Sequence, residues 1–366
     1  MTLYPALILD ALKSVRYPGN GKPVTELGMV ADNIRIDGMK VSFSLVFDKP
    51  SDPFIRSLVR TAEAAIHSAI SPDVEVSIAT EFKAAPAPKV NPLPGVKNII
   101  GISSGKGGVG KSTVAANLAV ALAAKGFSVG LLDADIFGPS VPKMFGVEDE
   151  PIYMVNKEGR DWIEPLERYG VKVLSIGFLV DKAKPVLWRG GMASNALKQL
   201  ITDAWWGDLD YFLIDMPPGT SDIHLTLVQT LPMTGVVVVT TPQEVAMADA
   251  RKGIAMFRQE QVNVPVLGLV ENMAWFTPAP HPEEKYFIFG KDGGLRLAEE
   301  TGVPLLGRIP LVTDIMTHAD EGTPIAAAGD GVEARDFAEL ADSVTAATER
   351  RNDLLPPSKP VEVKKG

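Results

Sequence analysis

Residues 105–112 read Gly-Lys-Gly-Gly-Val-Gly-Lys-Ser, and this stretch decides the fold that the sequence predicts. It matches the phosphate-binding pattern G-x-x-x-x-G-K-[ST], with a second lysine, Lys106, directly after the first glycine. The residues before it, Val96 to Ser104, are short and apolar as in a buried strand. Those after it, Ser112 to Lys125, are rich in Ala, Leu and Val as in a helix. The sequence therefore predicts a phosphate loop between a strand and a helix.

The residue types of this loop suit a nucleotide phosphate better than they suit a turn that binds nothing. Its glycines let the backbone approach a phosphate closely and permit positive φ. Backbone N–H groups then converge on phosphate oxygens at a helix N-terminus, where the helix dipole favours an anion. We expect Lys111 to reach the β and γ phosphates and the Ser112 hydroxyl to coordinate Mg²⁺. The nucleotide-binding residues predicted here are Gly105, Lys106, Gly107, Gly108, Val109, Gly110, Lys111, Ser112 and Thr113.

The composition restricts the class of protein. The chain has 366 residues, of which 46% are hydrophobic and 22% charged, as in a globular protein of two domains. No run reaches the ~18 consecutive apolar residues of a membrane span, and the N-terminus lacks the order of a signal peptide. A net charge of −9 disfavours nucleic-acid binding. We therefore expect a cytoplasmic protein that binds neither membrane nor nucleic acid.

The sequence divides into four parts. Residues 1–82 predict a small α+β domain, with a strand over Met39–Phe47 and an amphipathic helix from about 52 to 70. Residues 83–96 hold four prolines and predict a semi-rigid linker. Residues 97–350 alternate apolar strands with helices, which predicts an α/β fold, a mostly parallel sheet covered on both faces. The polar, proline-containing residues 351–366 predict a disordered tail.

Three aspartates follow predicted strands. Asp133 and Asp135 come after the strand that ends near Leu132, and Asp215 comes after the strand that ends at Ile214. Ligands bind beyond the carboxyl ends of strands in an open parallel sheet, so all three share an edge with the phosphate loop. We expect Asp215 to hold Mg²⁺, and Asp135 to position or deprotonate an attacking water. The alternative for each is a helix N-cap.

Three motifs together carry a family resemblance. They are the two-lysine loop with Lys106 and Lys111, Asp-Ala-Asp-Ile-Phe-Gly-Pro-Ser from 133, and Asp-Met-Pro-Pro-Gly-Thr-Ser-Asp from 215. Over residues 97–345 the chain resembles the Mrp/ApbC family of deviant Walker-A P-loop NTPases, which are related to MinD and ParA. The N-terminal unit is similar to a small domain shared with iron–sulfur assembly factors.

The resemblance implies a mechanism and partners. It implies an ATPase that forms a homodimer, in which Lys106 reaches the partner's nucleotide and acts with Lys111 and Asp135 in catalysis. It also implies that Asp135 and Asp215 lie in nucleotide-sensing segments, and that Asn272 contacts adenine. The implied function is ATP-driven transfer of iron–sulfur clusters to apoproteins, with ATP and Mg²⁺ as cofactors.

The chain departs from this family at the cluster site. Family members hold the cluster with a Cys-x-x-Cys pair in the segment that here runs from Ala274 to Gly290, yet this sequence has no cysteine at all. Thiolates hold nearly all iron–sulfur clusters, so a cluster is implied by family analogy alone. His281, Glu283 and Glu284 offer only nitrogen and oxygen donors, and an exposed proline-rich loop is the preferred interpretation.

Two other functions stay open. A positioning ATPase of the MinD or ParA kind would need a membrane-binding C-terminal helix or a basic DNA-binding face, and the prolines near the C-terminus and the acidic composition disfavour both. A nucleotide-gated scaffold, in which turnover is incidental, would keep the same phosphate loop.

Overall fold

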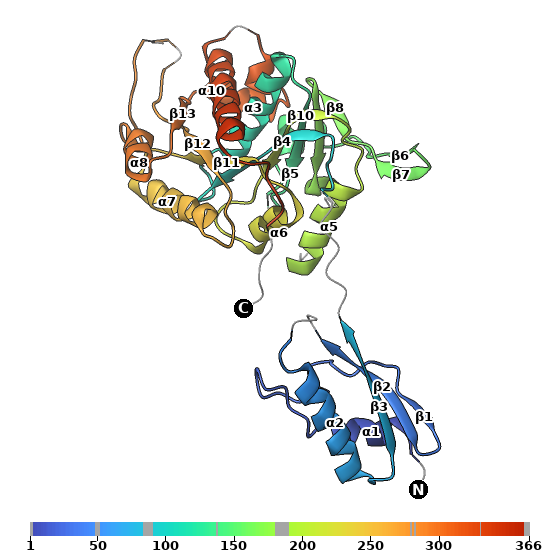
Figure 1. Ribbon diagram of the computed structural model, residues 1–366. Coiled ribbons are helices and arrows are strands. Elements are labelled where there is room, and N and C mark those ends of the chain that lie inside the picture. The colour runs from blue at the N-terminus through green and yellow to red at the C-terminus, as the bar shows by residue number, and fades with distance from the viewer. Residues whose placement is uncertain are drawn as a thin grey trace. The chain divides into compact units, whose positions relative to one another are not determined.

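The computed structural model describes residues 3–47, 52–82, 91–136, 138–179, 190–278, 280–281, 283–329 and 331–361. The chain forms two compact units, Met1–Lys89 and Val90–Gly366, and each is described on its own (Figure 1). Among the described residues, no helix has both the length and the apolar character needed to cross a membrane.

The first unit is a small α+β domain, as predicted. Its sheet has the order β1-β2-β3, with β1 antiparallel and β3 parallel to the central strand. Alternate residues of the middle strand are buried, and the longer helix buries Leu58, Ala62 and Ile66 along one stripe, so the two close a core. The elements are α1 (Pro5–Leu12), β1 (Arg35–Asp37), β2 (Lys40–Phe47), α2 (Ile55–Ala69) and β3 (Glu75–Phe82).

The second unit is built on an eight-stranded sheet of order β13-β12-β11-β4-β10-β5-β9-β8. Neighbouring strands are parallel except β8, which is antiparallel to β9 at one edge. A separate hairpin pairs β6 with β7. The strands are β4 (Val96–Ser104), β5 (Val129–Asp133), β6 (Met154–Lys157), β7 (Arg160–Ile163), β8 (Leu166–Arg168), β9 (Val171–Ser175), β10 (Leu209–Asp215), β11 (Gly235–Thr240), β12 (Val266–Glu271) and β13 (Leu305–Arg308).

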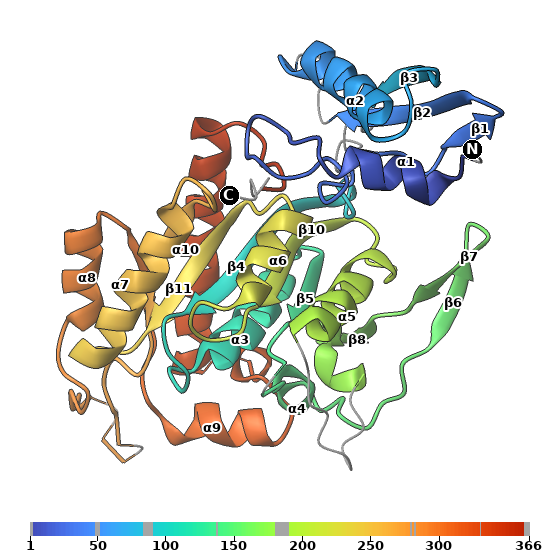
Figure 2. The same cartoon turned by 90° about the horizontal axis from the view of Figure 1, so that it is seen from below.

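Helices cover both faces of this sheet, as the apolar strands predict. Figure 2 shows α5, α6 and α7 on one face and α3 and α10 on the other. The two faces have separate cores, and α8 packs beside α7. The helices are α3 (Lys111–Ala124), α4 (Val141–Met144), η1 (Ile176–Leu179), α5 (Gly190–Thr202), α6 (Asp222–Thr230), α7 (Glu244–Arg258), α8 (Gly293–Thr301), α9 (Thr313–Asp320), η2 (Ile325–Ala327) and α10 (Val332–Leu354).

The structure places residues 91–96 and 351–361 differently from the two predicted boundaries. Of the predicted linker, residues 83–90 lie outside the described residues. Residues 91–96 belong to the second unit, where Leu93 is buried in the core. The tail predicted from 351 is ordered to 361: α10 runs to Leu354, and Arg351 donates hydrogen bonds to the carbonyl of Pro356 and the hydroxyl of Ser358. The prolines end the helix and hold an extended backbone that packs back onto the unit.

The strand order places the site. The chain leaves β4 to build β5, β9 and β10 on one side of that strand, and then β11, β12 and β13 on the other. Such a reversal opens a crevice at the carboxyl ends of the strands, next to the loop that follows β4. In register across this edge, Asp215 pairs with Ile102 of β4 on one side and with Asp133 of β5 on the other.

Candidate nucleotide-binding site

The loop between β4 and α3 needs its glycines for two different reasons. Gly108 and Gly110 have φ of +81° and +80°, in the left-handed region that side chains disfavour. A Cβ on Gly105 would lie 2.1 Å from the carbonyl carbon of Asp249, so the loop packs directly on the backbone of α7. The glycines thus allow both the backbone conformation of the loop and its close packing against α7.

Lys111 lies at the centre of the site. Its side chain is only 6% exposed, and its Nζ donates a 2.5 Å hydrogen bond to Oδ1 of Asp215. Oδ2 of Asp135 lies 3.8 Å from the same nitrogen, and the Ser112 hydroxyl lies 3.2 Å from it. A charge buried in this way must be paired. Folding therefore brings the predicted lysine and both predicted carboxylates together.

Asp215 has the form of a cation ligand. It is fully buried, and among the described residues its Oδ2 has no hydrogen-bond partner. Burial raises the pKa of this carboxyl, while the charge and hydrogen bond of Lys111 oppose the rise. Mg²⁺ prefers oxygen donors, and the free oxygen of Asp215 and the hydroxyl of Ser112 are such donors at one place. These residues fit a magnesium ion.

Asp133 is a member of the site to which the sequence assigned no role. Its carboxylate is fully buried and accepts hydrogen bonds from the backbone N–H of Asp135 (3.1 Å), the backbone N–H of Val141 (3.2 Å) and the hydroxyl of Ser175 (3.0 Å). Burial, and next the charge of Asp215, raise the pKa of Asp133 to about 8. The position of Asp133 at a strand end was the available signal, whereas nothing in the sequence marked Ser175.

The remaining loop residues lie where the pattern puts them. Lys106 is exposed, and its side chain makes no hydrogen bond or ion pair with the described residues. Val109 is 4% exposed and joins the core on the α3 face of the sheet. Thr113 is half-buried in the first turn of α3. The Lys106 side chain is thus exposed, while Val109 anchors the loop in the core.

Asn272, which follows β12, forms a hydrogen bond to the phosphate loop. Its side chain is 5% exposed, and its Nδ2 donates a 2.8 Å hydrogen bond to the carbonyl of Val109. The same nitrogen lies 2.1 Å from where a Cβ on Gly110 would be. The adjacent Glu271 is fixed by the backbone N–H of Gly294 and by Arg308. The adenine contact implied for Asn272 stays a prediction, and its contact with the loop is a feature that the sequence did not reveal.

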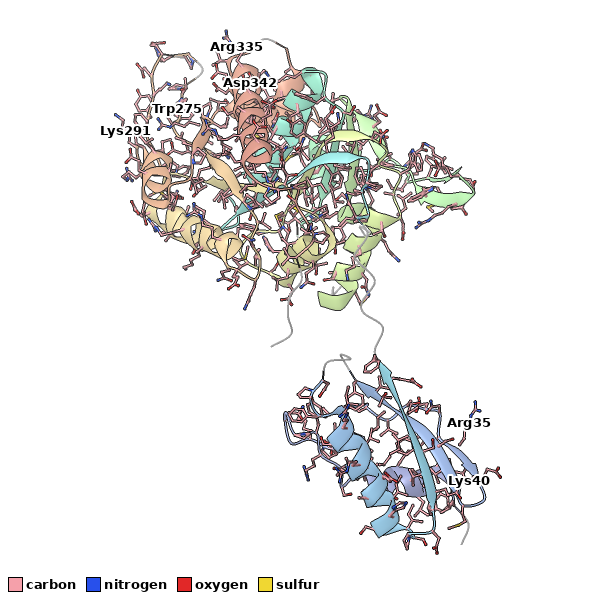
Figure 3. All side chains as sticks on the ribbon, viewed as in Figure 1. Arg35, Lys40, Trp275, Lys291, Arg335 and Asp342 are labelled. Carbon is pink, nitrogen blue, oxygen red and sulfur yellow. The ribbon has the colours of Figure 1, made fainter. Side chains whose placement is uncertain are left out.

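The loop between β12 and α8 carries the oxygen and nitrogen donors that the sequence singled out. Figure 3 shows Trp275 and Lys291 near the two ends of this loop. Donor atoms of His281, Glu283 and Glu284 lie within 4.8 Å of one another, and all three side chains are exposed. The exposure of His281 and Glu283 agrees with the preferred interpretation of this segment as a surface loop.

His224 is a buried histidine beside the site. It is 1% exposed in the first turn of α6, and its Nδ1 accepts a hydrogen bond from the backbone N–H of Ser221. The proton of the neutral ring therefore sits on Nε2, which is buried and has no partner among the described residues. Burial lowers the pKa of His224 to about 4, and the charge of Lys111 adds to this.

This histidine predicts an acid-sensitive stability. Its pKa is about 4 in the folded chain, below the ~6.5 of an unfolded chain, so between these values the unfolded state binds more protons. The stabilisation is complete above pH 6.5 and is lost as pH falls, to a total of about 3 kcal/mol. We expect His224→Gln to remove this part of the pH dependence. Urea unfolding of both proteins between pH 7 and pH 4.5 measures it, and parallel stability curves would contradict the prediction.

Taken together, a glycine-lined phosphate loop, a buried lysine and strand-end carboxylates at one sheet edge define a P-loop NTPase. Within that class, the chain belongs to the family described as NUBPL iron-transfer P-loop NTPases, whose model matches residues 95–345. A second family model, described as an iron–sulfur cluster assembly protein, matches residues 5–78. The resemblance to the Mrp/ApbC family and to assembly factors is thereby confirmed.

Known proteins agree with this assignment. An iron–sulfur cluster carrier protein from Synechocystis is 45% identical over 325 residues, covering 87% of this chain and 90% of the relative. The mouse iron–sulfur cluster transfer protein NUBPL is 44% identical over 268 residues, covering 72% of this chain and 82% of the relative. A solved nucleotide-binding protein from Archaeoglobus fulgidus, in complex with ADP, is 37% identical with a TM-score of 0.57, covering 67% of this chain and 93% of that one.

Proposed function

We propose that this chain is a Mg²⁺-dependent ATPase that acts as a homodimer in the assembly or delivery of iron–sulfur clusters. The observation that carries the ATPase proposal is the buried contact of Lys111 with Asp215, with Asp135 close by, at the mouth of the glycine loop. These are the three charges that binding and cleaving a triphosphate require, namely one cation for the phosphates and two carboxylates for metal and water.

Nucleotide binding exchanges the partners of Lys111. Its ammonium group is paired with Asp215, and phosphate oxygens would replace that carboxylate when ATP binds. Asp215 and Ser112 would then be free to hold Mg²⁺, which would supply positive charge against the phosphates. Asp135 orients a water whose oxygen bonds to the γ-phosphorus as the bond to the ADP oxygen breaks. The proton released by the water passes through Asp135 to the departing phosphate.

The exposed Lys106 suits a role across a dimer. A cation that stabilises charge on the transferring phosphoryl group must reach a nucleotide, and the Lys106 side chain is exposed rather than paired with the buried carboxylates of its own site. A second copy of the chain, facing the loop, would receive it. The side chain is exposed and makes no hydrogen bond or ion pair with the described residues, which supports this proposal.

The cluster role rests on relatives and on both matched families. Relatives 45% and 44% identical are named as an iron–sulfur cluster carrier and an iron–sulfur cluster transfer protein. The chain itself has no cysteine, so it offers no thiolate for a cluster. We therefore propose that the cluster is cargo held by thiolates of a partner protein. In this scheme ATP turnover drives the loading of the cluster onto the partner protein or its release from that protein.

Two measurements on the purified chain test the proposal. Phosphate release from ATP is expected with Mg²⁺ and not with excess chelator. A chain that binds ATP but never hydrolyses it would be a nucleotide-gated scaffold instead. Anaerobic incubation with iron and sulfide is expected to leave the chain colourless after desalting. A stable brown chromophore would contradict the assignment of the cluster to partner thiolates.

A further inference from the structure

We propose that Ser175 is a positioning residue for ATP hydrolysis, acting through Asp133 on the segment that carries Asp135. The inference rests on the proposed function, because it needs Asp135 to orient the attacking water. It goes beyond the proposed function by naming two fully buried side chains, Asp133 and Ser175, that set where that water is held.

The first step is the way Asp133 ties down the segment after β5. Its Oδ1 accepts a hydrogen bond from the backbone N–H of Asp135. Its Oδ2 accepts one from the backbone N–H of Val141, where α4 begins. One buried carboxylate therefore holds both ends of the segment between them. The position of the Asp135 side chain, 3.8 Å from Nζ of Lys111, depends on that anchorage.

The second step is the way Ser175 holds Asp133. The two residues pair in register across β9 and β5, and the Ser175 hydroxyl donates a 3.0 Å hydrogen bond to the same Oδ2 that binds Val141. Ser175 is fully buried, and its oxygen also accepts the backbone N–H of Gly177 at 2.9 Å. The Ser175 hydroxyl thus acts as both a hydrogen-bond donor and an acceptor, and it fixes the orientation of the Asp133 carboxylate.

The third step is the sensitivity of hydrolysis to small displacements. A misplacement of about 1 Å in a reacting group can slow a reaction by about 100-fold, while phosphate affinity depends on other contacts. Among the described residues, the side-chain hydrogen bonds of Ser175 and Asp133 join them to each other, to Gly177, and to the backbone of Asp135 and Val141, and none goes to the glycine loop or Lys111. Loss of the Ser175 hydroxyl should therefore slow the chemical step and leave nucleotide binding in place.

Ser175→Ala tests this inference. The expected result is a kcat lowered by about tenfold or more, with KM for ATP and affinity for a non-hydrolysable ATP analogue within about twofold of the parent. The backbone amides of Asp135 and Val141 should exchange hydrogen faster, because their hydrogen bonds to Asp133 have loosened. Ser175→Thr, which keeps the hydroxyl, should restore kcat. Thr240→Val, which removes a buried hydroxyl from the end of β11 at the same sheet edge, is the matched control and should hydrolyse ATP at the parental rate.

A second variant guards against a folding defect. In Asp133→Asn, one acceptor oxygen of the carboxylate is lost. Because Asp133 and Ser175 act as one unit, the kcat of the double variant with Ser175→Ala should be no lower than that of the slower single variant. A Ser175→Ala protein with the parental melting temperature and the parental kcat would overturn this inference and leave the proposed function standing. Equal loss of binding and turnover would also overturn it, since that points to a general structural role. A parent that binds ATP without hydrolysing it overturns the proposed function, and the positioning role with it.

Discussion

Replacing Asp215 with asparagine is expected to remove the Mg²⁺ dependence of ATP binding and to lower kcat by about 100-fold or more. The two side chains have the same shape, but asparagine has no charge to offer a divalent ion. The structure makes this loss severe, because the free oxygen of Asp215 is fully buried beside Lys111 and has no hydrogen-bond partner among the described residues. Lys111 also loses its 2.5 Å partner and keeps Asp135 at 3.8 Å as its nearest carboxylate.

This combination gives a distinctive result in the absence of metal. With its strongest carboxylate partner gone, Lys111 is available to phosphate before binding begins, so affinity for metal-free ATP should stay the same or rise. Calorimetric titration of ATP, with Mg²⁺ and with chelator, measures both effects in one experiment. The parent should bind more tightly with Mg²⁺, and the Asp215→Asn variant should bind equally under both conditions.

The same strand provides a control. Asp210, near the start of β10, forms a surface ion pair with Lys97 at 2.8 Å, far from the carboxyl edge. Asp210→Asn makes the same chemical change and should leave both titrations at parental values, since exposed ion pairs contribute about 1 kcal/mol or less to stability. An Asp215→Asn protein that still binds ATP more tightly with Mg²⁺ would rule out Asp215 as the metal ligand.

The sequence predicts the parts of this site that local patterns determine. The glycine loop is a contiguous motif, and apolar strands show where the sheet edge lies, so Lys111, Asp135 and Asp215 could be placed together in advance. The acidic residues gain meaning only because parallel strands bring their carboxyl ends to one edge. That rule is general, so it works without knowledge of the particular packing.

Contacts between distant residues could not be predicted in the same way. Ser175 reaches Asp133 across 42 positions and Asn272 reaches Val109 across 163, and neither pair is marked by composition or periodicity. The C-terminal segment illustrates the reverse error. Its prolines predict disorder, yet Arg351 binds the backbone of Pro356, an interaction that depends on the exact end of α10. Side-chain geometry after folding decides such contacts.

Lys106→Gln is expected to separate hydrolysis from binding. Nucleotide affinity should stay within about threefold of the parent, because Lys106 is exposed and contacts none of the buried charges that grip the phosphates. The kcat should fall by about 1,000-fold or more, as for other cations that stabilise a transferring phosphoryl group from a neighbouring subunit. Lys125→Gln is the control, since that lysine directly follows the last residue of α3 and forms an ion pair with the exposed Asp342.

Mixing two inactive variants decides whether Lys106 acts across a dimer. A dimer of Lys106→Gln with Asp135→Asn contains one site with an intact Asp135 that receives an intact lysine from the other copy. Random pairing makes about half of the dimers mixed, each with one complete site, so activity should return to about one quarter of the parental rate. If Lys106 serves the nucleotide of its own chain, every site in the mixture lacks one of the two residues. The mixture would then be as inactive as its components, and the role of Lys106 in a dimeric mechanism would be excluded.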